Sequence, residues 1–271
     1  MESSSKDISA FSGVNISNPY NLLIGAADNT GWLAWPGQVD DVRIYGRVLA
    51  PNEVAYLAAD ASVLWKFDDG YGAGATDCIG RSPGMLQNNP TWTTGHFGGA
   101  LALNGINQYV SVSNNSSDLN IGTGDFSISL WMQRSDSAAS NSRLLCKGAN
   151  SDNQIGYALS GSNTSLGLIL GNGVTRISTW CPTPSLNQWY HFVFTVNRVS
   201  GKCKSYVNGA YQSSKDISAF SGVNISNSYN LLIGAADNTG WLAWPGAVDD
   251  VRIYKRVLSA DEVTLLYSAT P

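Results

Sequence analysis

The residues best suited to chemistry lie in a glycine-rich loop that ends in a tryptophan. Residues 234–241 read Gly-Ala-Ala-Asp-Asn-Thr-Gly-Trp, so Asp237, Asn238 and Trp241 are close together in the chain. An indole ring can stack on the C–H face of a sugar, and neutral amides can hydrogen-bond to its hydroxyl groups. A ring in such a loop has less reason to be buried than one in a strand. The sequence therefore favours Trp241, Asp237 and Asn238 as carbohydrate-binding residues, whereas Trp244, nearer the following strand, is expected to pack.

A second polar loop, residues 148–154, contains Asp152 and Asn153. Loops rich in carboxylate and amide oxygens provide the ligands that Ca²⁺ prefers, so Asp152, Asn153 and Asp237 form one candidate calcium set and are also candidate sugar ligands. The alternative is ordinary turn chemistry, because Asn, Asp and Gly are frequent in loops of every kind. Trp180, between Ser178 and Cys181, could belong either to a binding surface or to the core.

A different candidate calcium set consists of Asp68, Asp249 and Asp250. Strand alternation predicts Asp249 on the same face as the apolar residues Val251 and Ile253, where an unpaired carboxylate would be costly. We therefore expect Asp249 to have a partner and a structural role rather than a ligand contact. The partners available to it are backbone amides, a metal ion, Arg252 and Arg256.

The chain lacks the usual residues of a hydrolase. Glycosidases use two carboxylates, and the only glutamates here are Glu2, Glu53 and Glu262. Neighbouring acids such as Asp249 and Asp250 point to opposite faces of a strand and cannot act as a pair. His191 lies inside an apolar strand, where a satisfied structural histidine is expected. We therefore expect a protein that is not an enzyme.

Composition narrows the class further. The 271 residues are 43% hydrophobic but only 13% charged, with a net charge of −4, which indicates a globular protein and argues against binding nucleic acid. No stretch predicts a membrane span, and the N-terminus has no apolar signal core, so any export signal is expected to lie outside this chain. The four cysteines, Cys78, Cys146, Cys181 and Cys203, allow two disulfides or free thiols.

Short alternating runs separated by Gly and Asn predict an all-β protein. Clear examples are residues 126–132 and 191–196, and Asn208-Gly209 favours a tight hairpin turn between 204–207 and 210–213. One helix is expected at 259–267, where Ser259 and Glu262 have the spacing of a capping box.

A segment of the chain is present twice. Residues 4–54 recur at 213–263 and differ only at Pro19/Ser228, Gln38/Ala247, Gly46/Lys255, Ala50/Ser259, Pro51/Ala260 and Asn52/Asp261. We interpret residues 1–60 as the C-terminal part of a preceding repeat and residues 62–271 as one complete domain. Strands from half a sandwich cannot bury their apolar face alone. We expect the second copy to complete its own domain and the first copy to dock on another chain. The alternative is that the first copy completes the 62–212 body and leaves the second copy free.

Several segments of the chain resemble a known family when they are taken in order. They are Val63–Asp69, Gly98–Gly105, Phe126–Trp131, Trp189–Val193, Tyr206–Gly209 and Gly246–Ser259 followed by Glu262. Together they resemble the laminin-G-like domains of the concanavalin A-like lectin/glucanase superfamily. The resemblance implies a jelly-roll sandwich of two antiparallel sheets, with ligands on the concave face or at the loops of one rim. It also implies that Trp65, Trp131 and Trp189 are core residues. In the related pentraxins, two loops at similar positions bind calcium jointly.

We therefore expect a non-catalytic carbohydrate-binding or adhesion module of a secreted or cell-surface repeat protein, assisted by Ca²⁺. Its expected partners are a polysaccharide or glycan and, through the duplicated segment, a second copy of the chain. The alternative is a structural repeat that self-associates without binding sugar.

Overall fold

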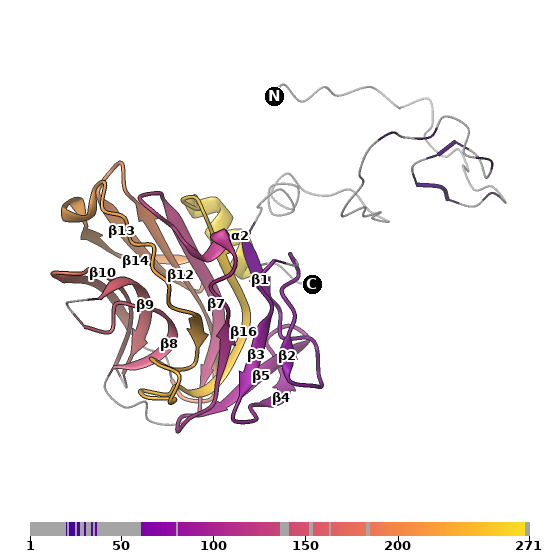
Figure 1. Ribbon diagram of the computed structural model, residues 1–271, viewed down its shortest axis with the longest axis horizontal. Coiled ribbons are helices and arrows are strands. Elements are labelled where there is room, and N and C mark those ends of the chain that lie inside the picture. The colour runs from indigo at the N-terminus through magenta and orange to yellow at the C-terminus, as the bar shows by residue number, and fades with distance from the viewer. Residues whose placement is uncertain are drawn as a thin grey trace. The chain divides into compact units, whose positions relative to one another are not determined.

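The computed structural model describes residues 61–268, apart from 80, 136–140, 152, 153, 163, 183 and 184, together with scattered positions between 20 and 36. The chain divides into two compact units, 1–48 and 49–271. Only the second has described secondary structure. That structure is a sandwich of two antiparallel sheets with one short C-terminal helix (Figure 1). The expected jelly-roll sandwich is confirmed.

The first sheet has eight strands, of which seven form a continuous order and β1 pairs with β16 beside them. In spatial order they are β14 (Ala210–Asp216), β13 (Lys202–Val207), β12 (Trp189–Asn197), β7 (Phe126–Arg134), β16 (Pro245–Tyr254), β5 (Gly99–Asn104) and β4 (Thr91–Thr94), with β1 (Val63–Trp65) on β16.

The second sheet also has eight strands. In spatial order they are β11 (Arg176–Pro182), β10 (Ser165–Asn172), β9 (Ile155–Gly161), β8 (Ser142–Lys147), β15 (Leu231–Ile233), β6 (Tyr109–Val112), β3 (Gly84–Gln87) and β2 (Gly74–Ala75). Two short 3₁₀ helices, η2 (Ser117–Leu119) and η3 (Ser218–Phe220), lie in the connections.

Period-two alternation explains why these segments form strands. In β7, Phe126, Ile128 and Leu130 point into the core, and Ser127 and Ser129 between them point to the outer face. The expected turn at Asn208-Gly209 is present, with φ of 48° and 76°, values that favour Asn and Gly in a two-residue hairpin.

The helix α2 (Ala260–Ser268) packs on the outer face of the first sheet, where its Val263 and Leu266 contact Val193 and Tyr254. Its capping box is reciprocal, as the sequence predicted. The Glu262 amide donates to Ser259 Oγ at 3.2 Å, and the Ser259 amide donates to Glu262 Oε2 at 2.8 Å.

The position of Asp249 differs from the prediction. A β-bulge between Asp249 and Arg252, with Asp250 at a φ of 49°, places one extra residue in β16. The bulge reverses the alternation, so both Val248 and Val251 reach the core while Asp249 pairs with Trp131 on the outer face. The expectation that Asp249 shares the apolar face of Val251 and Ile253 is therefore wrong.

The second copy of the duplicated segment is built into the middle of the sandwich. Its β15 lies between β6 and β8, and its β16 lies between β5 and β7. Leu231 and Ile233 of β15 are fully buried. The second copy therefore completes its own domain, and it is not a spare segment. The docking of the first copy falls outside the described residues.

The four cysteines are free, with Cys146, Cys181 and Cys203 buried and Cys78 exposed. Of the two states that the sequence allowed, the structure has the reduced one. Burial raises the pKa of the Cys181 and Cys203 thiols to about 12, so both behave as small apolar core residues.

Candidate binding site

The predicted loop after β15 presents one tryptophan to solvent and buries another. Trp244 is 0% exposed, whereas Trp241 is 55% exposed. The loop is closed by two backbone hydrogen bonds, from the Trp244 amide to the Gly234 carbonyl at 2.9 Å and from the Ala236 amide to the Trp241 carbonyl at 2.8 Å. Gly234 has a φ of 99°, which only glycine adopts readily. Trp244 thus anchors a turn that holds the indole of Trp241 outward.

Asp237 organises this turn from inside. Its Oδ1 accepts hydrogen bonds from the Thr239 amide at 2.9 Å, the Thr239 hydroxyl at 2.7 Å and the Trp241 amide at 3.2 Å. Partial burial favours a raised pKa for Asp237, but these hydrogen bonds outweigh it and hold the pKa below its ordinary value. Asp237 is therefore an ionised carboxylate that positions Trp241.

Asn238 is fixed through its backbone, because its carbonyl accepts the Tyr109 hydroxyl at 2.8 Å. Its side chain is exposed, three residues before Trp241 in the same loop. An exposed amide in the same loop as an exposed indole can donate to and accept from the hydroxyl groups of a stacked sugar ring.

The two predicted loops meet through Asn150, a residue not singled out from the sequence. Its Nδ2 donates to the Ala236 carbonyl at 2.7 Å, and its Oδ1 accepts from Arg143 Nε at 3.0 Å. Gln154 Oε1 accepts the Asn150 amide at 3.0 Å and closes the second loop. Asn150 lies in the polar segment 148–154, and this position was the only indication in the sequence that it could belong to the site. The positions of Asp152 and Asn153 in this loop are outside the described residues.

A third loop, 104–108, also borders the site and was missed from the sequence. Gly240 lies so close to it that a Cβ atom would come within 2.5 Å of the Asn107 Cα. Asn104 Oδ1 accepts the amides of Ile106, Asn107 and Gln108 at 2.9, 3.1 and 3.2 Å, which fixes the turn. Ile106 is 75% exposed. We call loops 104–108, 148–154 and 234–244 together the amide-rich edge.

Trp180 lies elsewhere on the second sheet. It pairs with Gly167 on β10, and a Cβ on Gly167 would come within 2.6 Å of its ring, so the indole covers that glycine. Its Nε1 donates to Ser178 Oγ at 2.8 Å, and the side chain remains 39% exposed. Strands β10 and β9 separate β11 from β8, so Trp180 is not part of the amide-rich edge.

The alternative metal set is occupied by protein partners. Asp68 Oδ1 accepts the Gly99 amide at 2.6 Å, and Asp249 Oδ2 accepts the Phe97 amide at 3.0 Å. Asp250 forms an ion pair with Arg252 at 2.7 Å. Of the partners that the sequence allowed for Asp249, the structure selects backbone amides. In the part of the chain that the structure describes, no three His, Cys, Asp or Glu side chains form a group that could hold a metal ion.

The histidines form an aromatic cluster on the outer face of the first sheet. His96 stacks on Trp131 with ring centroids 3.4 Å apart, and His191 lies 5.1 Å from the same indole. His191 Nε2 is 2.8 Å from Ser129 Oγ, and the residue is 1% exposed. His191 is thus buried on the sheet face, as the sequence predicted, but it is only half satisfied, because its buried Nδ1 has no hydrogen-bond partner among the described residues. Of the three tryptophans expected in the core, Trp65 and Trp131 are buried and Trp189 is half-buried.

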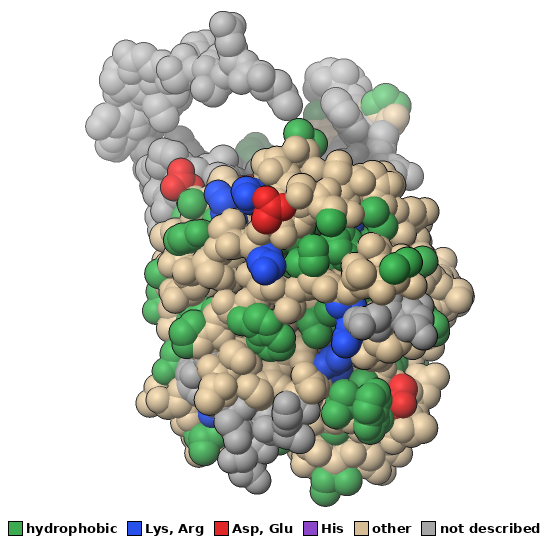
Figure 2. Space-filling view, turned by 90° about the vertical axis from the view of Figure 1, so that its left-hand side faces the viewer, with side chains coloured by type: hydrophobic (Ala, Val, Ile, Leu, Met, Phe, Trp, Pro, Cys, Tyr) green, Lys and Arg blue, Asp and Glu red, His purple; other side chains and the backbone are tan. Residues whose placement is uncertain are grey.

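The surface around the second sheet is neutral and polar. Figure 2 shows small separate groups of hydrophobic side chains on a largely uncharged face, with few Lys, Arg, Asp or Glu side chains. Such a surface fits a neutral ligand better than a polyanion.

One protein-family model matches the chain. The model of the concanavalin A-like lectin/glucanases superfamily named Laminin_G_3 matches residues 104–264. No curated protein sequence matches the chain.

Three solved structures illustrate the likeness in fold. The binding domain of Paraclostridial Mosquitocidal Protein 1 has a TM-score of 0.60 and 21% identity, over 76% of this chain and 51% of that one. The Botulinum neurotoxin serotype G binding domain has a TM-score of 0.60 and 18% identity, over 77% and 50%. This chain therefore spans about half the length of these toxin binding domains. Domain 4 of AbnA, a GH43 extracellular arabinanase from Geobacillus stearothermophilus solved with arabinotriose, has a TM-score of 0.57 and 21% identity, over 78% of this chain and 99% of that one.

Proposed function

The chain belongs to the concanavalin A-like lectin/glucanase superfamily, and from this premise we propose that it is a non-catalytic module that binds a neutral glycan at the amide-rich edge. The observation that carries the proposal is the indole of Trp241, 55% exposed on a loop held rigidly by Asp237, Asn150 and Trp244. A buried tryptophan anchors the fold, but an exposed one on a fixed loop offers a flat apolar surface to a ligand.

The neighbouring groups fit a sugar rather than an ion. Asn107, Asn150 and Asn238 bring side-chain amides to the three loops of the amide-rich edge, while Asp237 already accepts three hydrogen bonds within its own turn. Neutral donors and acceptors match the hydroxyl groups of a glycan without the cost of burying a charge. A fixed loop also loses little conformational entropy on binding, which favours affinity.

The comparisons support this proposal at the level of the fold. Domain 4 of AbnA is a single module that this chain covers almost completely, and it was solved with arabinotriose. Another similar structure concerns botulinum neurotoxin type C and its interaction with two ganglioside molecules. AbnA is an extracellular enzyme, and the neurotoxin depends on gangliosides for cell entry, so we propose an extracellular or cell-surface location for this chain. No described helix has the length and apolar character needed to cross a membrane.

Calcium assistance is part of the proposal at the set Asp152, Asn153 and Asp237. Asp237 Oδ1 is engaged within its turn, so a bound ion would rely on its Oδ2 and on ligands from loop 148–154. A calcium ion that binds only the folded chain raises the melting temperature. The test is thermal unfolding in EDTA and in excess Ca²⁺, and identical melting temperatures would remove calcium from the proposal.

The main experiment uses the duplication as an internal control. Trp32 occupies in the first copy the position that Trp241 occupies in the second. A glycan array that includes arabino-oligosaccharides and gangliosides identifies the ligand of the full chain, and titration calorimetry gives its affinity. Trp241→Ala should weaken binding at least tenfold, equivalent to about 1.4 kcal/mol. Trp32→Ala and the exposed-residue control Tyr211→Ala should bind as the unaltered chain does.

Two outcomes would contradict this site. Unchanged affinity in Trp241→Ala would remove the amide-rich edge as the binding surface. Loss of binding in Trp180→Ala alone would place the ligand on the outer face of the second sheet, three strands from β8.

A specific observation favours self-association as a second function. Leu22 and Ile24 are 70% and 59% exposed, but their counterparts in the second copy, Leu231 and Ile233, are fully buried. Apolar side chains that are core residues in one copy and exposed in the other favour docking on a further molecule. Light scattering of the full chain and of Leu22→Asn/Ile24→Asn tests this. A monomer at all concentrations would contradict it.

A further inference from the structure

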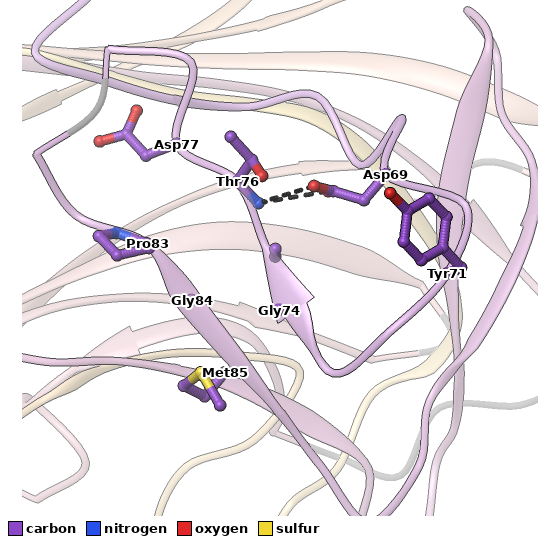
Figure 3. A pocket seen from close by; sticks show the side chains of 9 residues that line it. Asp69, Tyr71, Gly74, Thr76, Asp77, Pro83, Gly84 and Met85 are labelled. Carbon is purple, nitrogen blue, oxygen red and sulfur yellow. Dashed lines mark hydrogen bonds between the residues drawn. The ribbon is translucent and has the colours of Figure 1, made fainter.

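A pocket of about 470 Å³ opens at the far edge of the second sheet, beside the short strands β2 and β3. Its walls come from Asp69, Tyr71, Met85, Thr76 and Pro83, and Gly74 and Gly84 contribute bare backbone. Figure 3 shows Asp69 and Tyr71 together at one end of the pocket and Met85 and Pro83 at the other. None of these residues belongs to the amide-rich edge.

The pocket is held open by the packing beneath it. A Cβ atom on Gly84 would clash with Val110, so this wall of β3 has no side chain and the strands can lie close together. The buried carboxylate of Asp77 accepts the amides of Leu64 and Ser82 at 3.0 and 2.9 Å and fixes the connection between β2 and β3. The pocket is therefore a preformed feature of the fold.

The loop that holds Tyr71 is also fixed by two hydrogen bonds directly after this residue. Trp92 Nε1 donates to the Gly72 carbonyl at 3.2 Å, and the Leu86 amide donates to the Ala73 carbonyl at 2.8 Å. Tyr71 is nevertheless 84% exposed, and Met85 is 55% exposed. Two large apolar side chains thus stand in water at opposite ends of a rigid pocket.

The polar groups in the pocket complement these apolar ones. Both oxygens of Asp69 lie 3.2 Å from the amide of Thr76, so the carboxylate is oriented by one shared donor and keeps most of its acceptor capacity. A carboxylate held in this way can accept two neighbouring hydroxyl groups at once, and a phenol ring can pack against the C–H face of the same sugar ring.

We propose that the pocket formed by Asp69, Tyr71 and Met85 is a second saccharide subsite, which takes one ring of a neutral glycan with adjacent hydroxyl groups. The inference rests on the proposed function as a glycan-binding module, and it makes that module bivalent. Two sites on one rigid domain strengthen binding to a polymeric or clustered glycan far more than to a short oligosaccharide, because the second contact becomes intramolecular.

The chain offers a direct probe of this pocket, because its three methionines are in different environments. Met85 lines the pocket, Met132 is 1% exposed in the core, and Met1 is at the N-terminus. The full chain is labelled with ¹³C at the methionine methyl groups and with ¹⁵N at the tryptophan indoles. Arabinotriose, cellotriose and chitotriose are each titrated to about 10 mM, which is ten times a weak Kd of about 1 mM. Met85→Leu assigns the signal, and the Trp241 indole ¹⁵N signal reports the amide-rich edge in the same sample.

At least one trisaccharide should shift the Met85 methyl signal saturably while the Met132 signal stays in place. Tyr71→Ala and Asp69→Asn should each weaken this response at least tenfold, and the control Tyr211→Ala should retain it. An unchanged Met132 signal in each variant verifies that the sandwich is folded.

The two sites fail in distinguishable ways. A stationary Met85 signal with a shifted Trp241 signal overturns the pocket and leaves the proposed function intact, whereas the reverse pattern supports the pocket and overturns the amide-rich edge. If neither signal moves, both proposals fail. A Met85 shift that does not saturate, or that persists in Tyr71→Ala and Asp69→Asn, also overturns the subsite, as does a response to the cationic peptide Gly-Arg-Gly but to none of the sugars.

Discussion

Two buried ionisable groups flank Trp131 on the outer face of the first sheet and should oppose each other in their effect on stability. Asp249 and His191 are both cross-strand neighbours of Trp131, and each is 1% exposed. Burial raises the pKa of Asp249 to about 7 and lowers the pKa of His191 to about 3. In the folded protein at pH 5.5, the carboxyl is therefore protonated and the imidazole is neutral.

The two shifts give pH dependences of opposite sign. Between about pH 4 and 7 the folded state keeps the Asp249 proton that the unfolded state has lost, so the free energy of unfolding falls as pH rises. Between about pH 3 and 6.5 the unfolded state holds a His191 proton that the folded state lacks, so the free energy of unfolding rises with pH. Each effect amounts to about 1.3 kcal/mol per pH unit near pH 5.5, and the two nearly cancel.

Two variants that cannot titrate separate the two effects. Asp249→Asn keeps an acceptor for the Phe97 amide, and His191→Gln keeps a partner for Ser129 Oγ. Urea unfolding is followed by tryptophan fluorescence from about pH 4 to 6.5, in EDTA so that metal binding does not contribute. As pH rises, the free energy of unfolding of Asp249→Asn should increase, relative to that of the unaltered chain, by about 1 kcal/mol per pH unit. That of His191→Gln should decrease, relative to the unaltered chain, by a similar amount.

The double variant Asp249→Asn/His191→Gln should restore the pH profile of the unaltered chain, displaced by a constant. Single-variant profiles parallel to that of the unaltered chain would contradict both pKa shifts, because they would mean that both groups titrate alike in the folded and unfolded states.

Three further predictions concern single residues. Lys147 donates hydrogen bonds to Asn114 and Tyr229, and burial lowers its pKa to about 8. The free energy of unfolding of the unaltered chain should therefore rise between about pH 8 and 10.5, because there the unfolded state holds a proton that the folded state lacks. In urea unfolding, Lys147→Met should not show this rise. Ser259→Ala should lower the free energy of unfolding by about 1 kcal/mol through loss of the helix cap, and an unchanged value would show that the capping box contributes nothing. Asp237→Ala should weaken glycan binding at least tenfold, because the loop that holds Trp241 is released. The melting temperature should fall by no more than about 4 °C. Full affinity in this variant would contradict the positioning role of Asp237.

The general architecture could be predicted because the signals that set it are local. Alternation identified strands such as 126–132, the Asn208-Gly209 pair identified its hairpin, and the spacing of Ser259 and Glu262 identified the helix start. The jelly-roll sandwich was predicted from the order of the family's characteristic segments along 62–271, because no local pattern specifies it. The distinction between Trp241 and Trp244 also followed from local context, because one lies in a glycine-rich turn and the other before a strand.

The remaining features depend on contacts between distant residues. The bulge after Asp249 has no signature in the local sequence, so strand parity gave the wrong face. Asn150 joins loops 86 residues apart, and Gly240 meets Asn107 only in the folded chain. The pocket around Tyr71 depends on pairing between β2 and β3, two strands too short to be predicted from alternation.

Titration calorimetry on Trp241→Ala and its matched counterpart Trp32→Ala tests whether the exposed indole of Trp241 holds a neutral glycan. With the glycan that the array identifies, binding should be at least tenfold weaker for Trp241→Ala and unchanged for Trp32→Ala. Equal affinities in the two variants and the unaltered chain would contradict this role of Trp241.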